Sequence, residues 1–383
     1  MPLNRIYFDI SATTPIDPRV ADFMHDLQKK TYGNPSSIHR EGQAARAVVE
    51  KSRRELAIAL RCSPEEIIFT SSGSESNNMV LKGVLSKGDH FITSSYEHPA
   101  ILKVLPYLEE KGIDFSLIKP DKNGIVQPKS VEEKIKDNTR LISIMYVNNE
   151  LGTINPICEI SCISKEKGIL FHSDAVQALG KIPVNVGGDI SADFLSMSAH
   201  KLYGPKGTGA LFMRKGTTIK PLIYGGGQEA NLRASTENIS GVGGFGMAVE
   251  LANMGLEENS KHITRLETHF ISQLDEKEID YRINGIERVP GVLNMTFINI
   301  DGQNLVMQLD MAGIGISYGA ACASGTAKTS TILQGMGLTK EETLSTVRIS
   351  FGKIHSLKDI ETVANAIHQI LIQQNEEFIA YEG

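Results

Sequence analysis

The residue best suited to covalent chemistry is Lys201, the last residue of the hexapeptide SMSAHK at positions 196–201. It directly follows an apolar stretch that has the composition of a buried strand. A lysine just past a strand end, among hydroxyls and an imidazole, suits a Schiff-base amine at the ligand-binding edge of a sheet. Most lysines are simply solvated, so this interpretation depends on which other residues Lys201 would meet.

A carboxylate ends a second apolar stretch, because positions 169–177 read ILFHSDAVQ, with Asp174 following the hydrophobic part. Pyridoxal 5'-phosphate needs a carboxylate beside its ring nitrogen, since a protonated ring can withdraw electrons from a carbanion. Taken alone, Asp174 is more simply explained as the cap of a following helix. Together with Lys201 it favours a pyridoxal-phosphate site.

A Ser- and Gly-rich turn follows a third apolar stretch, in the sequence IIFTSSGSESNN at positions 67–78. If this turn opens a helix, its backbone N–H groups and the helix dipole favour a bound phosphate. The same residues also make ordinary helix caps. The sequence has no G-x-x-x-x-G-K-[ST] motif and no G-x-G-x-x-G that opens a βαβ unit, which disfavours a nucleotide-dependent enzyme.

Three further polar residues are candidates: His98 and Asn149 follow expected strands, and Arg348 lies within one. His98, in YEHP, could stack on a flat ring or move protons, although a single histidine is more often structural. Asn149 could hydrogen-bond a phenolate oxygen or a carboxylate. Arg348 could clamp a substrate carboxylate through two parallel hydrogen bonds, or equally well form a salt bridge with an acidic side chain.

Cys322 is the cysteine with the most reactive setting, because it lies in the Gly- and Ala-rich segment GAACASG at positions 319–325 rather than in a periodic apolar element. We expect Cys62, Cys158 and Cys162 to be packed structural residues. Cys158 and Cys162 have no further ligand spaced nearby, so no metal site is expected. Four irregularly spaced cysteines give no disulfide framework and indicate a reducing compartment.

Composition narrows the function classes. The 383 residues include 41% hydrophobic and 22% charged residues, as in soluble globular proteins, and about 150 residues per domain gives two to three domains. A net charge of -6, 6% aromatic residues and no Trp disfavour a nucleic-acid-binding surface. The chain has no signal or transit pattern and no apolar run of about 18 residues, so we expect a cytoplasmic protein without membrane contact.

The elements that would position these residues follow an α/β pattern. Seven short apolar runs are expected as strands, at 67–70, 91–94, 115–118, 141–147, 169–172, 194–197 and 210–213. Helical patterns separate most of them, which predicts a largely parallel, doubly wound sheet. A charged helix at 256–277, strands at 293–300 and 347–351, and a last helix capped by Ser356 and Asp359 predict a smaller α+β domain. We expect a large domain at 15–254 and a small one formed by 1–14 and 255–383.

The chain resembles the pyridoxal-phosphate-dependent cysteine desulfurases of the NifS/IscS type, within the class V aminotransferases. The resemblance runs along nearly the whole chain and includes YFDISATTPIDPRV, YGNPSSIHREGQ, IIFTSSGSESNN, YEHPA, SIMYVNNELGTINPI, FHSDAVQALGKIPV, SMSAHKLYGPKGTGALF, GGGQEANLRASTEN, GAACASG and VRISFGK. It implies the fold type I of pyridoxal-phosphate-dependent transferases, with a mostly parallel central sheet and a smaller α+β domain.

The resemblance also implies how the cofactor is held. Lys201 would be the Schiff-base lysine, His98 would stack on the ring and handle protons, and Asp174 would contact the ring nitrogen. The ring hydroxyl and the phosphate would be contacted by Gln177, Asn149, Gly73, Ser74, Ser198 and His200, with Thr236 reaching over from the second subunit of a homodimer.

The implied reaction is the conversion of L-cysteine to L-alanine. Asn149 and Arg348 would bind the substrate carboxylate, the freed amine of Lys201 would remove the α-proton, and Cys322 would take the sulfur as a persulfide. His98 would accept the thiol proton of Cys322. The sulfur would then pass to an acceptor protein, such as an iron–sulfur scaffold or a tRNA-thiolation enzyme.

The sequence departs from the family pattern in two places. The family usually reads SSGSAC around the cysteine, whereas positions 317–322 read SYGAAC, and SGS at 72–74 replaces Gly-Gly-Thr or Gly-Ala-Thr. The length from Cys322 to the next expected helix resembles that of the long-loop members of the family. In these members the cysteine swings out to pass sulfur to partner proteins. A selenocysteine lyase or a small-amino-acid aminotransferase is the alternative of the same fold. A non-catalytic scaffold is a third possibility, disfavoured by the presence of Lys201, Asp174, His98 and Cys322 together.

Overall fold

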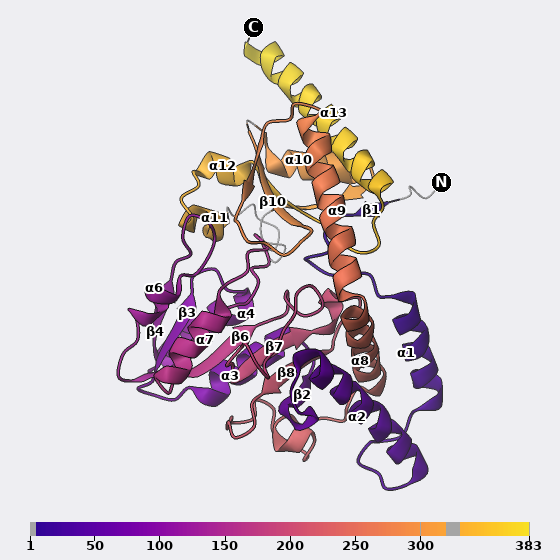
Figure 1. The fold of residues 1–383 in the computed structure, drawn as a ribbon, viewed down its shortest axis with the longest axis vertical. Helices are drawn as coiled ribbons and strands as arrows, with labels where there is room; N and C mark the ends of the chain where they lie inside the picture. Colours follow the sequence, from indigo (N-terminus) through magenta and orange to yellow (C-terminus); the bar gives the residue numbers. More distant parts are fainter. Residues whose placement is uncertain (1–4, 299, 319–329, 383) are drawn as a thin grey trace.

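The computed structural model describes residues 5–298, 300–318 and 330–382. Its larger part is built on a seven-stranded sheet (Figure 1). In spatial order the strands are β2 (Ile67–Thr70), β8 (Gly209–Met213), β7 (Phe194–Ser198), β6 (Leu170–Asp174), β5 (Thr139–Ser143), β3 (His90–Ser94) and β4 (Asp114–Ile118).

All seven expected strands are confirmed, and the sheet is mostly parallel. Only β8 runs antiparallel, to both β2 and β7. The expected strand at 141–147 is shorter than predicted, because β5 ends at Ser143. After Ser143, the backbone N–H groups of Ile144 and Tyr146 still donate hydrogen bonds to β6, to the carbonyls of His172 and Asp174 respectively.

A buried histidine ties three parallel strands together near their carboxyl ends. The ring of His172 on β6 hydrogen-bonds the hydroxyls of Ser143 on β5 (2.7 Å) and Ser196 on β7 (2.9 Å). Burial lowers the pKa of His172 to about 3, so the ring is neutral at physiological pH. These hydrogen bonds hold β5, β6 and β7 in place relative to one another. They thereby help to position Asp174 and Ser198, the last residues of β6 and β7.

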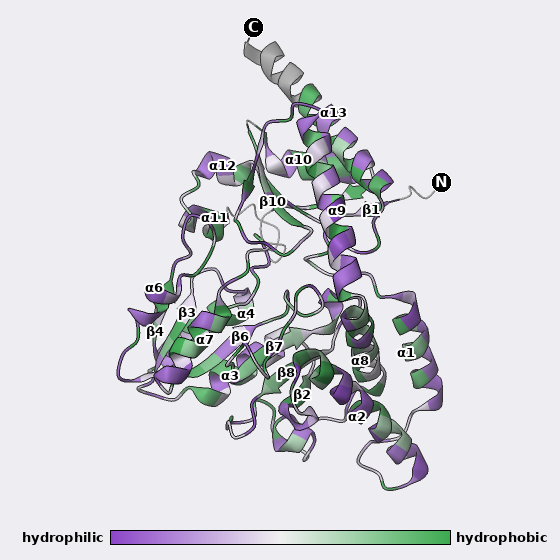
Figure 2. Cartoon of the chain, viewed as in Figure 1, coloured by the Kyte–Doolittle hydropathy of each residue, from purple (hydrophilic) through white to green (hydrophobic). Residues whose placement is uncertain are grey.

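Helices cover the sheet and add a layer beside it (Figure 1). The helix α8 (Ile239–Met254) packs against α1 (Pro18–Lys30) and α2 (Arg40–Leu60), and Figure 2 shows it hydrophobic along most of its length. A Cβ on Gly246 of α8 would lie 2.6 Å from the Cα of Ser52 on α2. Glycine is therefore required for this close helix contact.

Shorter helices follow the other strands: α3 (Gly73–Val84), α4 (Pro99–Leu102), α5 (Leu105–Glu110), α6 (Pro128–Glu132) and α7 (Ile157–Glu166). The 3₁₀ helices are η1 (Pro64–Glu66), η2 (Ala199–Lys201) and η3 (Glu229–Asn231). The α3 and η2 helices begin where β2 and β7 end. These two junctions bring the Ser-rich turn and Lys201 to one edge of the sheet.

The smaller part contains an antiparallel sheet in the order β12 (Ser317–Tyr318), β13 (Thr346–Ser350), β10 (Val292–Phe297) and β9 (Tyr281–Asn284). The expected strands at 293–300 and 347–351 correspond to β10 and β13, with shifted ends. The N-terminal strand β1 (Ile6–Tyr7) pairs in parallel with β11 (Ile314–Gly315). The first residues of the chain therefore join its last third.

The helices of the smaller part are α9 (Leu256–Asp275), α10 (Gly302–Met311), α11 (Thr331–Gly335), α12 (Lys340–Leu344) and α13 (Leu357–Glu382). The expected cap of the last helix is confirmed, because Ser356 and Asp359 exchange hydrogen bonds. Gly255 separates α8 from α9 (Figure 1). The proposed division at residue 254 stays a prediction.

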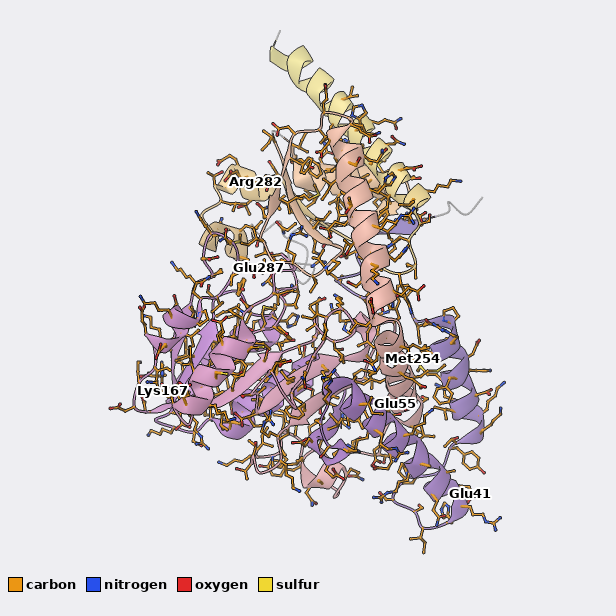
Figure 3. All side chains as sticks on the ribbon, in the orientation of Figure 1. Glu41, Glu55, Lys167, Met254, Arg282 and Glu287 are labelled. Atoms are coloured by element: carbon orange, nitrogen blue, oxygen red, sulfur yellow. The ribbon has the colours of Figure 1, made fainter. Side chains whose placement is uncertain are left out.

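The side-chain view shows Glu41 and Lys167 on the outside of the larger part and Arg282 and Glu287 on the smaller part (Figure 3). None of the described helices is long and apolar enough to cross a membrane. Within the described ranges, no group of three or more His, Cys, Asp or Glu side chains could hold a metal ion.

Candidate active site

A pocket lies at the carboxyl ends of the parallel strands, where ligands bind in open α/β sheets. Its free volume, including the part that is open to solvent, is about 780 Å³. The lining residues are Ser11, Ala12, Ser72, Gly73, Ser74, Asn77, His98, Met145, Asn149, Asp174, Val176, Gln177, Ser198, His200, Lys201 and Arg348. This set includes all but two of the residues expected at the site.

Lys201 ends the 3₁₀ turn η2 directly after β7. Its Nζ donates to the backbone carbonyls of Ser11 (2.6 Å) and Ala12 (2.7 Å). These two residues belong to the N-terminal segment, which therefore lies next to the end of β7. The contacts place the amine in the pocket, within reach of a ligand held there.

Asp174 is a buried carboxylate at the end of β6, with 5% of its surface exposed. Its Oδ2 accepts a hydrogen bond of 2.7 Å from Nδ2 of Asn77, and its Oδ1 accepts one of 3.0 Å from the backbone N–H of Val176. The helix that Asp174 could have capped does not form, because a turn follows β6; the carboxylate holds this turn and also faces the pocket. Two donors fix the carboxylate before any ring nitrogen approaches.

The start of α3 forms the anion-binding end of the pocket. Ser72 is the N-cap, and its hydroxyl accepts from the backbone N–H of Glu75. The first-turn N–H groups of a helix have no partner within that helix, and with the helix dipole they attract a phosphate. A Cβ on Gly73 would lie 2.5 Å from Cγ2 of Val176. Only glycine therefore fits beneath this side chain.

Ser198 and His200, the other residues expected at the phosphate, lie in the same pocket at the end of β7. The ring of His200 hydrogen-bonds the hydroxyl of Thr13 at 3.1 Å. Burial and the neighbouring Lys201 lower the pKa of His200 to about 4. His200 is therefore neutral at pH 7, and a neutral ring offers a phosphate a hydrogen bond rather than a positive charge.

His98 is the N-cap of the short helix α4. Its Nδ1 accepts a 3.0 Å hydrogen bond from the backbone N–H of Ala100. In the neutral ring the proton therefore lies on Nε2. His98 thus has a structural contact on one side and lines the pocket on the other.

Arg348 is almost fully buried, with 2% exposure, on β13 of the smaller part. It forms a salt bridge of 2.6 Å with Asp9 and donates at 2.7 Å to the backbone carbonyl of Asn149. Among the described residues its Nε has no hydrogen-bond partner. The salt bridge suggested by the sequence is present, and unused donor capacity remains in the pocket for an anionic group.

Two expected site residues are not placed in the pocket. Thr236 is exposed and is not among the lining residues. Cys322 lies outside the described residues.

One expectation about the other cysteines is wrong. Cys162 is exposed rather than packed, because it faces outward from α7, whereas Cys158 is half-buried on the same helix. Cys62 is half-buried, and burial together with the nearby Glu66 raises its pKa to about 12. A thiol with so high a pKa is a poor nucleophile at neutral pH.

Sequence reasoning assigned no role to Asn77, Ser11 or Ala12. Asn77 lies in the quoted segment IIFTSSGSESNN, on the first turns of α3, and its position near the phosphate loop was an available signal. Ser11 and Ala12 act through their backbone carbonyls. Such a contact does not depend on the type of side chain and leaves no mark in the sequence.

The pocket fits pyridoxal phosphate. It contains an amine, a fixed carboxylate, an imidazole and a helix N-terminus whose glycine allows close approach. These four features match the aldehyde, the ring nitrogen, the ring face and the phosphate of that cofactor.

Comparison with known proteins agrees with this geometry. The family model described as "Aminotransferase class-V" matches residues 6–363. A cysteine desulfurase IscS from Dictyoglomus turgidum is 41% identical, covering 96% of this chain and 95% of the relative. A mitosomal cysteine desulfurase from Encephalitozoon cuniculi is 40% identical, over 99% and 89% respectively. The structure of a NifS-like protein from Rickettsia africae superimposes with a TM-score of 0.87 at 35% identity, covering 96% of this chain and 99% of that one. The chain therefore belongs to the class V aminotransferase family, within its cysteine desulfurases of the NifS/IscS type.

Proposed function

We propose that this enzyme is a pyridoxal-phosphate-dependent cysteine desulfurase, which converts L-cysteine to L-alanine and retains the sulfur as a persulfide on Cys322. The observation that carries the proposal is the single pocket in which Lys201, Asp174, His98 and Arg348 meet. When bound, pyridoxal phosphate supplies an electron sink for the carbanion formed at the substrate Cα.

The residues of the pocket divide the remaining work. Asp174 holds a proton at the ring nitrogen, where Asn77 and the Val176 N–H keep its carboxylate in place. Arg348 takes the substrate carboxylate with its remaining N–H groups, and the amine of Lys201 removes the α-proton. The Nε2 side of His98 accepts or returns a proton at the reacting sulfur.

Sulfur transfer needs the thiolate of Cys322, because the thiol itself is a weak nucleophile. The thiolate attacks the sulfur of the substrate, so that an S–S bond forms as the C–S bond of the substrate breaks. The electron pair left on the substrate carbon takes up a proton, which gives alanine. No external oxidant is needed, because the substrate carbon is reduced as the sulfur is oxidised.

Replacement of Cys322 tests the proposal. Cys322→Ser preserves the volume but removes the nucleophilic thiolate, so it should bind the cofactor normally and lose sulfide and alanine production from cysteine by at least about 100-fold. Cys162→Ser, which removes an exposed thiol far from the pocket, is the matched control and should retain the wild-type rate.

Mass spectrometry of the wild-type protein after treatment with cysteine should find one reductant-sensitive sulfur on the Cys322 peptide. Wild-type sulfide release by Cys322→Ser would contradict the persulfide step and favour a selenocysteine-lyase type of reaction, which expels its leaving group without a protein thiol.

We further propose that the enzyme is a cytoplasmic homodimer that passes sulfur to an iron–sulfur scaffold or a tRNA-thiolation enzyme. The support for the acceptor is the naming of its relatives as cysteine desulfurases IscS. Cell fractionation tests the location, and transfer of radiolabelled sulfur from the loaded enzyme to each purified acceptor tests the partner.

A further inference from the structure

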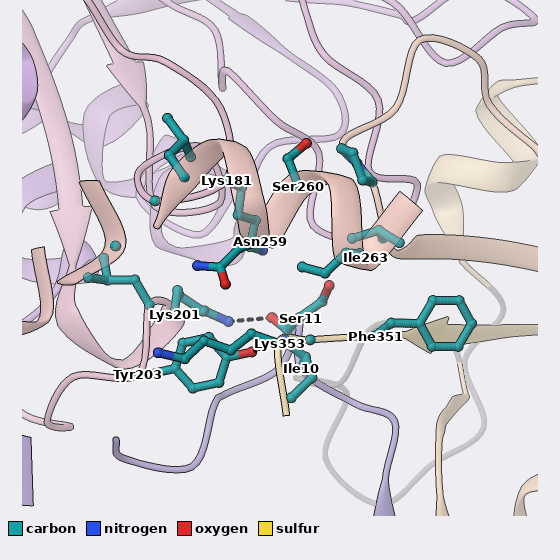
Figure 4. Close-up of a pocket in the computed structure, with 17 residues that line it drawn as sticks. Ile10, Ser11, Lys181, Lys201, Tyr203, Asn259, Ser260, Ile263, Phe351 and Lys353 are labelled. Carbon is teal, nitrogen blue, oxygen red and sulfur yellow. Dashed lines mark hydrogen bonds between the residues drawn. The ribbon is translucent and has the colours of Figure 1, made fainter. Parts of the chain in front are cut away.

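Lys181 is a second lysine beside the active site, and the reaction described above does not use it. It lies on the turn that follows β6, four residues after Gln177, and its Nζ donates a hydrogen bond to Oε1 of Gln177. It also lines a cavity next to the active-site pocket, together with Lys201 (Figure 4).

The surroundings of Lys181 disfavour the charged form of its amine. Among the described residues it forms no ion pair with a carboxylate. Burial, followed by the positive charges of Lys201 and Arg348, lowers the pKa of Lys181 to about 7. Much of the cavity beside it is apolar, lined by side chains such as Ile263 and Val292. An apolar side chain would suit such surroundings better, so stability alone does not explain a lysine here.

The amine does determine how the Gln177 amide is oriented. The protonated amine of a lysine can only donate hydrogen bonds, so in this form Lys181 faces the amide oxygen. On the other side, Nε2 of Gln177 donates to the carbonyl of Ser11 at 2.8 Å, and a carbonyl can only accept. Because Lys181 donates and the Ser11 carbonyl accepts, both contacts favour the same orientation of the Gln177 amide. The second hydrogen of Nε2 is then available to an acceptor in the pocket.

The same carbonyl links Gln177 to the reactive amine. The Ser11 carbonyl accepts from both Gln177 and Lys201. Lys181, Gln177, Ser11 and Lys201 thus form one continuous hydrogen-bonded chain, and loss of its first member removes one of the two contacts that orient the amide.

We propose that Lys181 is a positioning residue of the cofactor site, which holds the Gln177 amide nitrogen towards the pocket so that it can donate to an oxygen of the pyridoxal ring. This inference rests on the proposed function. Without Lys181, the amide oxygen loses its donor and only the contact with the Ser11 carbonyl remains, so the N–H is aimed at the ring less firmly.

The test uses the holoenzyme and the Lys181→Met variant, which keeps the length of the side chain and removes the donor. Loss of one ring hydrogen bond should raise the dissociation constant of pyridoxal phosphate about 3- to 10-fold and shift the visible absorbance maximum of the bound cofactor. Gln177→Met should show the same two changes. The double variant should be no worse than Gln177→Met, because Lys181 acts through Gln177.

Two further variants separate positioning from general damage. Lys353→Met removes another lysine of the same cavity, whose amine pairs with Asp17 rather than with Gln177, and should keep the wild-type spectrum and affinity. Lys181→Arg retains a donor and should restore most of the affinity; it also provides the comparison if Lys181→Met does not fold.

An unchanged spectrum and affinity in Lys181→Met would overturn the inference, and so would effects of Lys181→Met and Gln177→Met that simply add. If instead the wild-type protein took up no pyridoxal phosphate, the proposed function itself would fail. The two failures are therefore distinguishable.

Discussion

Asp174, His98 and Arg348 are each held by a contact that is independent of any ligand. Asp174 accepts from Asn77, His98 accepts from the backbone of Ala100, and Arg348 pairs with Asp9. Polar groups fixed in advance need no reorganisation when charge develops during a reaction, which is the main source of electrostatic catalysis. At the scale of the residue, the contacts that stabilise these side chains in the fold are therefore the same contacts that would orient them for the proposed reaction.

Glu97, the neighbour of His98, is buried, with 3% exposure, and should make folding pH-dependent. Its Oε1 accepts from the Ser94 hydroxyl and the Met145 N–H, while its Oε2 has no partner among the described residues. Burial raises the pKa of Glu97 from the ordinary 4.5 to about 8. The carboxyl group is therefore protonated in the folded state and ionised in the unfolded state at neutral pH.

The sign of the effect follows from this difference. Because the folded pKa is raised, the contribution of Glu97 to stability is complete below about pH 4.5 and is lost as the pH rises to about 8. Glu97→Gln, which mimics the neutral acid, should flatten the decline in the free energy of unfolding between pH 5 and pH 8, by an amount on the order of a few kcal/mol. Denaturant unfolding across this pH range measures it, with the exposed Glu109→Gln as the control. Parallel profiles for wild type and Glu97→Gln would refute the prediction.

At the scale of the element, the site depends on how closely α3 approaches the turn after β6. Gly73→Ala should push α3 away from Val176, because the new methyl group would lie 2.5 Å from Cγ2 of that residue. Overpacking of this kind costs about 1–3 kcal/mol, and we expect the affinity for pyridoxal phosphate to fall about 5- to 100-fold. The measurement is a titration of the apoenzyme with the cofactor.

The second-site variant Gly73→Ala/Val176→Ala removes the clash and should recover most of that affinity. If the double variant bound the cofactor as poorly as Gly73→Ala, a backbone requirement at Gly73, rather than the contact with Val176, would be the cause.

The elements were predictable where local pattern determines them. The seven strands are short apolar runs bounded by turns, and the Ser356–Asp359 cap is a local motif. Contacts between distant segments were not, since Asn77 meets Asp174 across 97 positions of sequence. The outward orientation of Cys162 was also missed, because the spacing of Cys158 and Cys162 does not say which face of α7 is covered.

At the scale of the whole molecule, the segment 225–237 carries Thr236, the residue that would act in a second subunit of the proposed homodimer. Two ion pairs hold this segment to the larger part: Glu229 with Arg53 (2.8 Å) and Arg233 with Glu75 (2.9 Å). Thr236 nevertheless points to solvent. A fixed loop that presents an exposed hydroxyl is compatible with the proposal that Thr236 completes the phosphate site of a partner.

Mixed dimers test this proposal. Lys201→Ala should be inactive, and Thr236→Ala should bind the cofactor weakly. If Thr236 acts across a two-fold interface, unfolding and refolding the two variants together should create one intact site in each heterodimer, or roughly a quarter of all sites. The recovered desulfurase activity measures this fraction. Activity no higher than the sum of the separate variants would place the action of Thr236 within its own subunit.

The N-terminal segment has a consequence for the biogenesis of the enzyme. Its Ser11 and Ala12 carbonyls hold Lys201, Asp9 pairs with Arg348 across 339 positions, and β1 pairs with β11. During synthesis the first residues leave the ribosome long before these partners exist, and domains fold as their sequence emerges. The Asp9–Arg348 clamp therefore forms only after residue 348 has left the ribosome. We expect tight loading of the cofactor to follow the synthesis of residue 348, so chains truncated before that residue should accumulate without it.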